Sequence, residues 1–138
     1  MEFAAERAFV ERYIRKGRRD RLLHELTHPG KRYAGLSRFC HQAEDLLDRG
    51  LVRCSGPDLF RQDLMLRLLA EHGGEDCALL SPDPLLDGLT VPLARAARLA
   101  EACPDAVILL ARRFAVVQEE AMKGGRARFL LCEPAGLR

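Results

Sequence analysis

The chain has 138 residues, a length typical of one domain, with 48% hydrophobic and 30% charged residues. This balance excludes a disordered chain, and no apolar run approaches the roughly 20 residues that a membrane-spanning helix needs. The formal net charge is only +2. The first 62 residues nevertheless carry an excess of basic side chains and the remainder a smaller excess of acidic ones, which permits an anionic partner near the N-terminal half.

The first half of the chain shows helical periodicity. Apolar residues recur three and four positions apart, and serine, proline and glycine stand where helices would begin or end. Pro29-Gly30 is expected to end the second of these helices. Four helices are predicted, with a short extended piece at 51–54 before the last of them, over residues 2–16, 19–28, 35–48 and 55–73.

The second half changes to shorter apolar runs. A helix is expected over residues 91–103, where alanines allow close approach, and the other runs suit strands. Lys123-Gly124-Gly125 is typical of a hairpin turn. The strands are predicted at residues 77–80, 106–111, 114–120 and 126–132. We therefore expect a single α+β domain over 1–138, in which a helix-rich half (1–75) packs with a small, mainly antiparallel sheet and one helix (76–134).

The five cysteines are widely spaced and form no Cys-x-x-Cys pair. This spacing argues against a disulfide framework and against a cysteine zinc site. Most of the cysteines lie in or beside apolar runs, where a thiol packs as a small hydrophobic group. Buried free thiols, together with an acidic N-terminus that lacks the features of a signal peptide, predict a cytoplasmic protein.

One short motif carries specific chemistry. His24-Glu25-Leu26-Thr27-His28 resembles the His-Glu-x-x-His pattern of zinc metallopeptidases. The resemblance implies that His24 and His28 bind a zinc cofactor and that Glu25 is the general base for the metal-bound water. His41 is a candidate third ligand, with Glu44, Asp45 and Asp48 as alternatives. The resemblance covers five residues.

The same helix supports a simpler interpretation of these histidines. Leu22, Leu23 and Leu26 centre on one side of it, and both histidines centre almost opposite them. If the leucines face the core, the histidines are partly exposed near a helix end and no cofactor is bound. Pro29 can also end the helix directly after the second histidine.

Basic residues cluster around the first two predicted helices. Basic side chains beside Tyr33 and Phe39 can meet the phosphates and bases of a nucleic acid, or another anion. The alternative is a solvated helix surface. The candidate anion-binding residues are Lys16, Arg18, Arg19, Arg21, Lys31 and Arg32.

A further acidic set lies in the second half. Pro104-Asp105 followed by Glu119, Glu120 and Lys123 resembles the site of nucleases that hold a metal with two acids and a lysine. The spacing departs from that pattern, because the lysine falls in the predicted turn.

Residues 126–132 are rich in apolar side chains and are expected to form an exposed sheet edge. No catalytic set is complete, so the leading hypothesis is a non-enzymatic interaction or accessory protein that pairs with a protein partner or with itself.

Overall fold

The centre of the fold is an antiparallel sheet. The computed structural model describes residues 2–133, and within them the strands are β1 (Val52–Ser55), β2 (Asp76–Leu80), β3 (Thr90–Pro92), β4 (Val107–Leu110), β5 (Phe114–Gln118) and β6 (Arg128–Cys132). They form one sheet in the order β1-β6-β5-β4-β2-β3. Every neighbouring pair is antiparallel. The predicted α+β class with a C-terminal antiparallel sheet is therefore confirmed.

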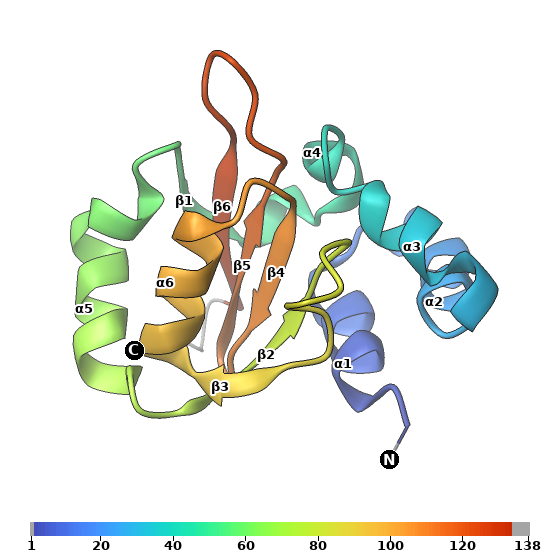
Figure 1. The fold of residues 1–138 in the computed structure, drawn as a ribbon, viewed down its shortest axis with the longest axis horizontal. Helices are drawn as coiled ribbons and strands as arrows, with labels where there is room; N and C mark the ends of the chain where they lie inside the picture. Colours follow the sequence, from blue (N-terminus) through green and yellow to red (C-terminus); the bar gives the residue numbers. More distant parts are fainter. Residues whose placement is uncertain (1, 134–138) are drawn as a thin grey trace.

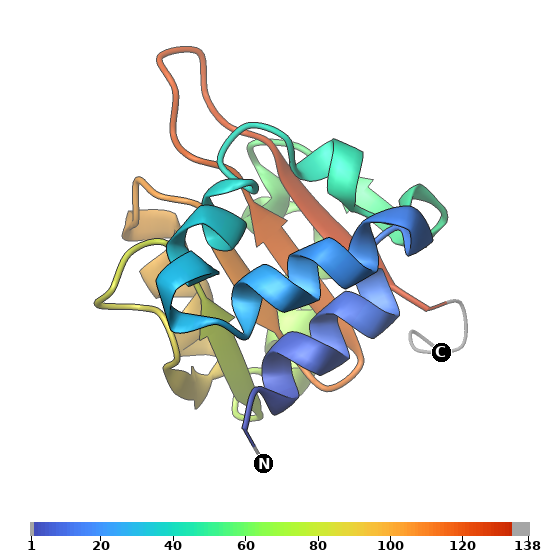
Figure 2. The ribbon, with the colours of Figure 1, turned by 90° about the vertical axis from the view of Figure 1, so that its right-hand side faces the viewer.

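Helices cover both faces of this sheet. One face carries the N-terminal helices, and the other carries the two helices that come later in the chain (Figures 1 and 2). The first group is α1 (Ala4–Tyr13), α2 (Arg19–Leu26), α3 (Pro29–Ser37) and α4 (Ala43–Leu46), and the second is α5 (Asp63–His72) and α6 (Leu93–Ala102). No helix within residues 2–133 combines the length and the apolar character needed to cross a bilayer.

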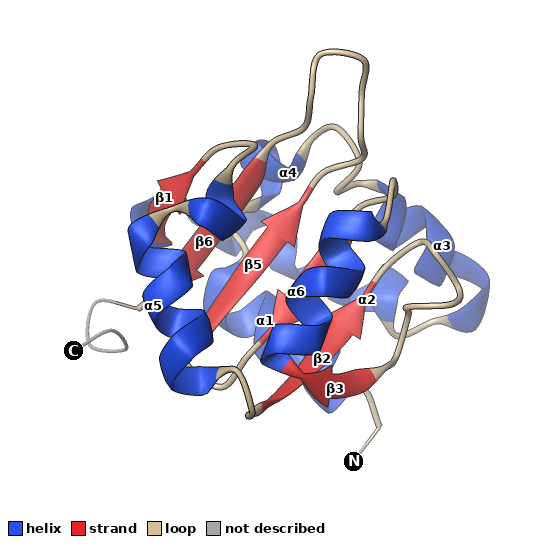
Figure 3. Ribbon diagram, turned by 60° about the vertical axis from the view of Figure 1, so that its left-hand side comes forward, coloured by secondary structure: helices blue, strands red, loops and turns tan. Residues whose placement is uncertain are grey.

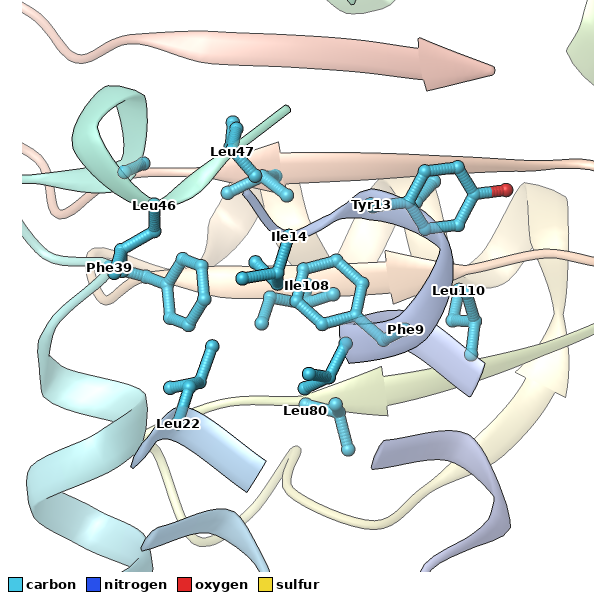
Figure 4. Packing of buried hydrophobic residues seen from close by; sticks show 14 of the residues in the cluster. Phe9, Tyr13, Ile14, Leu22, Phe39, Leu46, Leu47, Leu80, Ile108 and Leu110 are labelled. Carbon is cyan, nitrogen blue, oxygen red and sulfur yellow. The ribbon is translucent and has the colours of Figure 1, made fainter. Parts of the chain in front are cut away.

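Each face of the sheet has its own apolar core. Ile108 and Leu110 of β4 pack with the N-terminal helices, whereas Val107 and Leu109 pack with α5 and α6. This alternation follows from the two-residue period of a strand. All four side chains of β4 are buried, as expected for the central strand predicted at 106–111. Figure 4 shows the N-terminal core, where Phe9, Phe39 and Leu22 meet the sheet.

The single helix predicted over 35–48 is wrong. The chain instead forms α3 and the short α4, with a non-helical stretch between them. The apolar stripe is still buried, so the pattern identified the inner face correctly. The helix is interrupted because the β5–β6 connection takes its backbone groups: the Cys40 carbonyl accepts from the Glu120 amide at 3.0 Å, and the Ala43 amide donates to Glu119 at 3.2 Å.

Pro29 both follows one helix and begins another. α2 ends at Leu26, and Pro29 occupies the first turn of α3, where a missing amide hydrogen is tolerated. His28 is the N-cap of α3 in an extended conformation, with φ −113° and ψ 117°. The prediction that Pro29-Gly30 closes the second helix missed the helix that begins there.

The exposed edge predicted at 126–132 is also wrong. β6 lies between β1 and β5, and Phe129, Leu130 and Leu131 are buried. Within the described residues the sheet edges are β1 and β3, which the sequence did not identify as paired strands. Both are short: β1 has a register irregularity between Val52 and Cys54, and β3 ends in Pro92. Short, bulged or proline-bearing edges resist pairing with another chain.

Candidate functional site

The His-Glu-x-x-His segment does not lie on one continuous helix. His24 is on α2, but His28 lies beyond its end. Both imidazoles are exposed, and their ring centroids are 3.9 Å apart. His28 Nδ1 donates to the His24 carbonyl oxygen at 2.7 Å, because a carbonyl can only accept. The two rings therefore stack on the surface and do not face a cleft.

Glu25 is a buried partner in an ion pair. Its side chain turns inward, is 9% exposed as a residue, and accepts from Arg38 Nε and Nη2 at 2.6 and 2.8 Å. These hydrogen bonds lower the pKa of Glu25, against the opposing effect of burial. Both carboxylate oxygens are thus occupied by one guanidinium. This geometry does not support the role of general base for a water held between His24 and His28.

The third proposed ligand pairs elsewhere. His41 Nε2 lies 3.0 Å from a carboxylate oxygen of Glu120. Within residues 2–133, the group of three potential ligand side chains that comes together is instead Asp83, Cys103 and Asp105, with ligand atoms within 4.8 Å of one another. The Cys103 thiol donates to Asp83 at 3.6 Å, so this cluster is internally hydrogen-bonded.

The six basic candidates separate into two groups. Arg32 is largely buried: it contacts Glu6 at 2.6 Å, Asp87 at 2.8 Å and the Leu26 carbonyl at 2.9 Å. Arg19 donates to the Ile14 carbonyl at 2.8 Å. These two arginines are structural. The other four candidates are exposed, namely Lys16, Arg18, Arg21 and Lys31.

The largest groove described lies at the end of the sheet where β1 and β6 meet. It has a volume of about 480 Å³ and lies between the turn 55–57 after β1 and the loop 119–127 that joins β5 to β6. Figure 3 shows this loop projecting beyond the sheet. Phe129 and Glu44 also line it, and a second hollow of about 290 Å³ shares both residues. We call this combined hollow the hairpin groove.

Glycines shape both walls of the hairpin groove. Gly56 has φ +135°, and a Cβ there would lie 2.8 Å from Asp58 Oδ1. Gly125 has φ +106° and closes the tight turn at the tip through reciprocal backbone bonds with Met122. Both positions require glycine because L side chains rarely adopt these angles. The walls of the groove are therefore formed by backbone turns. Met122, at the tip of the loop 119–127, is 59% exposed.

The groove contains one carboxylate without a cationic partner. Glu119 is half-buried, and its Oε2 accepts only from the Ala43 amide at 3.2 Å. Burial raises the pKa of Glu119 more than the hydrogen bond from the Ala43 amide and the nearby His41 lower it, and the negative charge of Glu44 adds a smaller raising effect. By contrast, Glu120 pairs with His41 and Glu44 pairs with Arg49 at 2.8 Å. No Lys, Arg or His among residues 2–133 comes within ion-pair distance of Glu119.

Two arginines of the groove are committed to internal contacts. Arg126 donates to the Cys103 and Glu101 carbonyls at the end of α6. Arg128 donates to the buried Gln118 at 2.8 Å and to the Pro57 carbonyl. Burial lowers the pKa of both guanidiniums. They fasten the hairpin to its neighbours through uncharged oxygen atoms, so their two positive charges remain in the groove wall beside the unpaired carboxylate of Glu119.

Comparisons with protein-family models, with curated proteins and with solved structures find no match to this chain. The site must therefore be argued from its own geometry. Sequence reasoning selected Glu119 and Glu120, but as part of a resemblance to nucleases. It missed the hairpin groove because the groove depends on the pairing of β1 with β6, segments that are distant in the chain.

Proposed function

We propose that this chain is a non-enzymatic interaction domain that binds an extended, basic segment of a partner protein in the hairpin groove. The observation that carries the proposal is Glu119, a half-buried carboxylate with a raised pKa and no cationic side chain within ion-pair distance. A perturbed ionisable group in a groove of this size supports a binding site. Ser55 also lines the groove, but no complete set of nucleophile, acid and base accompanies Glu119 among the described residues.

The chemistry of the groove defines its occupant. A carboxylate that is costly to bury alone is stabilised by an incoming lysine or arginine side chain. Phe129 and Met122 offer apolar surface to the neighbouring side chains of the same segment. A volume of about 480 Å³ suits a few residues of extended peptide and is too small for a folded domain.

Strand addition at the sheet edge is a less favourable mode. β1 is four residues long, carries the exposed Arg53, and is irregular between Val52 and Cys54. Two copies paired through β1 would bring basic side chains together. This pairing is unfavourable, because like charges on facing strands repel. The proposal therefore places the partner in the groove beside the strand, not on the strand as an added partner.

A blocking substitution tests the site. Ser55 is exposed on the groove wall, so Ser55→Arg should fill the groove with a bulky cation without touching the core. Random peptides displayed on phage would be selected on the wild-type protein, and the best peptide measured by fluorescence anisotropy. We expect selected peptides to contain Lys or Arg, Ser55→Arg to abolish their binding, and Glu119→Gln to weaken it by about tenfold.

The matched control lies at the opposite edge of the sheet. Thr90→Arg introduces the same side chain at an exposed position of β3, far along the strand order from β1. It should leave peptide affinity unchanged. If selection yields only peptides that bind wild type and Ser55→Arg equally well, the groove is not the binding site and the proposed function is wrong.

A further inference from the structure

The two candidate motifs of the N-terminal half form one surface. Arg18 and Arg21 come from the basic run, His24 and His28 from the histidine motif, and Lys31 from the start of α3. All five are exposed. Arg18, Arg21 and His24 follow one another three positions apart, which places their side chains side by side along α2. Beyond the end of α2, the contacts of His24 with His28 and Lys31 continue the row to α3. We call these five residues the cationic row.

Direct contacts connect the members of the cationic row. Lys31 Nζ lies 3.4 Å from His24 Nε2, and the His24 and His28 rings lie against each other with an angle of 38° between their planes. Because an ammonium group can only donate, Lys31 is the donor in its contact with His24.

Two carboxylates lie near the row. The charged groups around the two imidazoles are Asp20, Arg21 and Glu25 on α2 and Lys31 on α3. Asp20 is exposed one turn before His24, whereas Glu25 lies 3.9 Å from Arg21 but is held by two shorter bonds from Arg38. Among residues 2–133, no carboxylate pairs with Arg18 or Lys31. The row is thus a strip in which positive charges outnumber negative ones.

We propose that the cationic row binds the phosphate backbone of a nucleic acid strand, independently of sequence. An acidic protein surface offers the same sign of charge. Protein interfaces, however, centre on buried apolar and aromatic side chains, and the row contains none. A line of cations without an apolar centre matches a phosphate backbone, which is bound mainly by charge.

Fluorescence anisotropy with a labelled, mixed-sequence single-stranded DNA of about 20 nucleotides tests the proposal at low salt. We expect a Kd on the order of 10⁻⁵ M. Affinity should fall steeply with salt, with a log–log slope of about −2 to −4. Substituting Arg18, Arg21 and Lys31 together with alanine should abolish binding.

Two further variants test which exposed side chains matter. The double variant His24→Gln, His28→Gln keeps Arg18, Arg21 and Lys31 and should retain most of the affinity. Arg53→Ala with Arg61→Ala removes two exposed cations elsewhere and should change little, beyond the weak effect of net charge. Circular dichroism should show every variant to be folded, as expected for exposed positions.

Three outcomes would overturn the inference. They are the absence of DNA binding at low salt, binding that survives loss of the three basic side chains, and binding of polyglutamate in preference to DNA. The last result would assign the row to an acidic protein. None of these outcomes bears on the hairpin groove, because the row lies on α2 and α3.

Discussion

At the scale of single residues, Glu25 illustrates how a motif is overruled by its surroundings. The residue sits in a sequence pattern typical of a catalytic base, yet its carboxylate faces Arg38 in the interior. Bidentate, charge-assisted bonds of this kind are among the stronger polar contacts in proteins. The neighbouring histidines face solvent because Leu22 and Leu26 take the inner side of the same helix. The expected opposition of leucines and histidines on this helix was therefore right.

The Glu25–Arg38 pair predicts a specific dependence of stability on pH. Because the folded-state pKa of Glu25 is lowered, its contribution is complete above its usual value of 4.5 and is lost as pH falls through the lower folded value. Glu25→Gln should therefore cost about 1–3 kcal/mol at neutral pH, and less in acid. Urea unfolding of both proteins between pH ~7 and pH ~3 measures this difference. A cost that stays constant over that range would contradict the assignment.

Arg32 was predicted from the sequence to be an anion-binding residue on the surface, but its side chain is largely buried. It joins α3 to Glu6 of α1 and to Asp87 in the loop after β2, with all three side chains mostly buried. Arg32→Ala would leave two carboxylates without their cation, so we expect a loss of about 2–4 kcal/mol in unfolding free energy. Arg18→Ala, at an exposed position, should change stability by less than about 0.5 kcal/mol. Equal denaturation midpoints for the two variants would refute this distinction.

The candidate site could be predicted only in part at this scale. Sequence patterns identified the basic residues and the histidines that form the cationic row, but they could not separate Arg18 from Arg32. That separation depends on Glu6 and Asp87, which are distant in the chain. Glu119 likewise gains its unusual environment from Ala43 and Glu44 on α4. The chemical type of each candidate residue could be read from the sequence, whereas the residues that each one contacts could be identified only from the fold.

At the scale of elements, α2 and α3 approach each other closely at one glycine. A Cβ at Gly35 would lie 2.9 Å from Glu25 Cβ and 3.2 Å from Leu26 Cδ2. Gly30, in the same helix, has nothing within 4 Å of such a position. The contrast between these two glycines gives a test of helix packing with the same chemical change at both sites.

Gly35→Ala should destabilise the protein by about 1–3 kcal/mol despite the better helix propensity of alanine, because the new methyl group forces the two helices apart. Gly30→Ala should instead stabilise it by up to about 1 kcal/mol. Thermal melts followed by circular dichroism measure both changes. Opposite signs support the packing of α2 on α3, and a stabilising effect at both positions would show that the two helices do not meet there.

Most elements could be predicted because their signals are local. The buried strand at β4, the β5–β6 hairpin and the helix α6 all follow from apolar runs and turn residues within a few positions. The interruption between α3 and α4 has no local signal: Arg38 to Gln42 contains neither glycine nor proline. Hydrogen bonds from Glu120 and to Glu119, supplied by the hairpin, decide it instead. Tertiary contacts of this kind override helical propensity.

At the scale of the whole molecule, the two faces of the sheet are closed and its two edges are poor pairing surfaces. Helices cover both sides, and β1 and β3 are short (Figures 1 and 3). The two proposed binding sites therefore lie outside the faces and edges of the sheet. They are the hairpin groove at one end of the sheet and the cationic row on the outer helices. This arrangement could not be read from the sequence, because the position of β6 between β1 and β5 creates it.

The central claim is that the hairpin groove receives a basic segment of a partner protein. The most direct measurement is a titration of isotope-labelled protein with a selected peptide, followed residue by residue through the amide resonances. We predict shifts concentrated at Glu44, at the turn 55–57 and between residues 119 and 129. At the same peptide concentration, these shifts should be smaller in Glu119→Gln and absent in Ser55→Arg. Shifts confined to α2 and α3, or scattered without relation to the groove, would contradict the account.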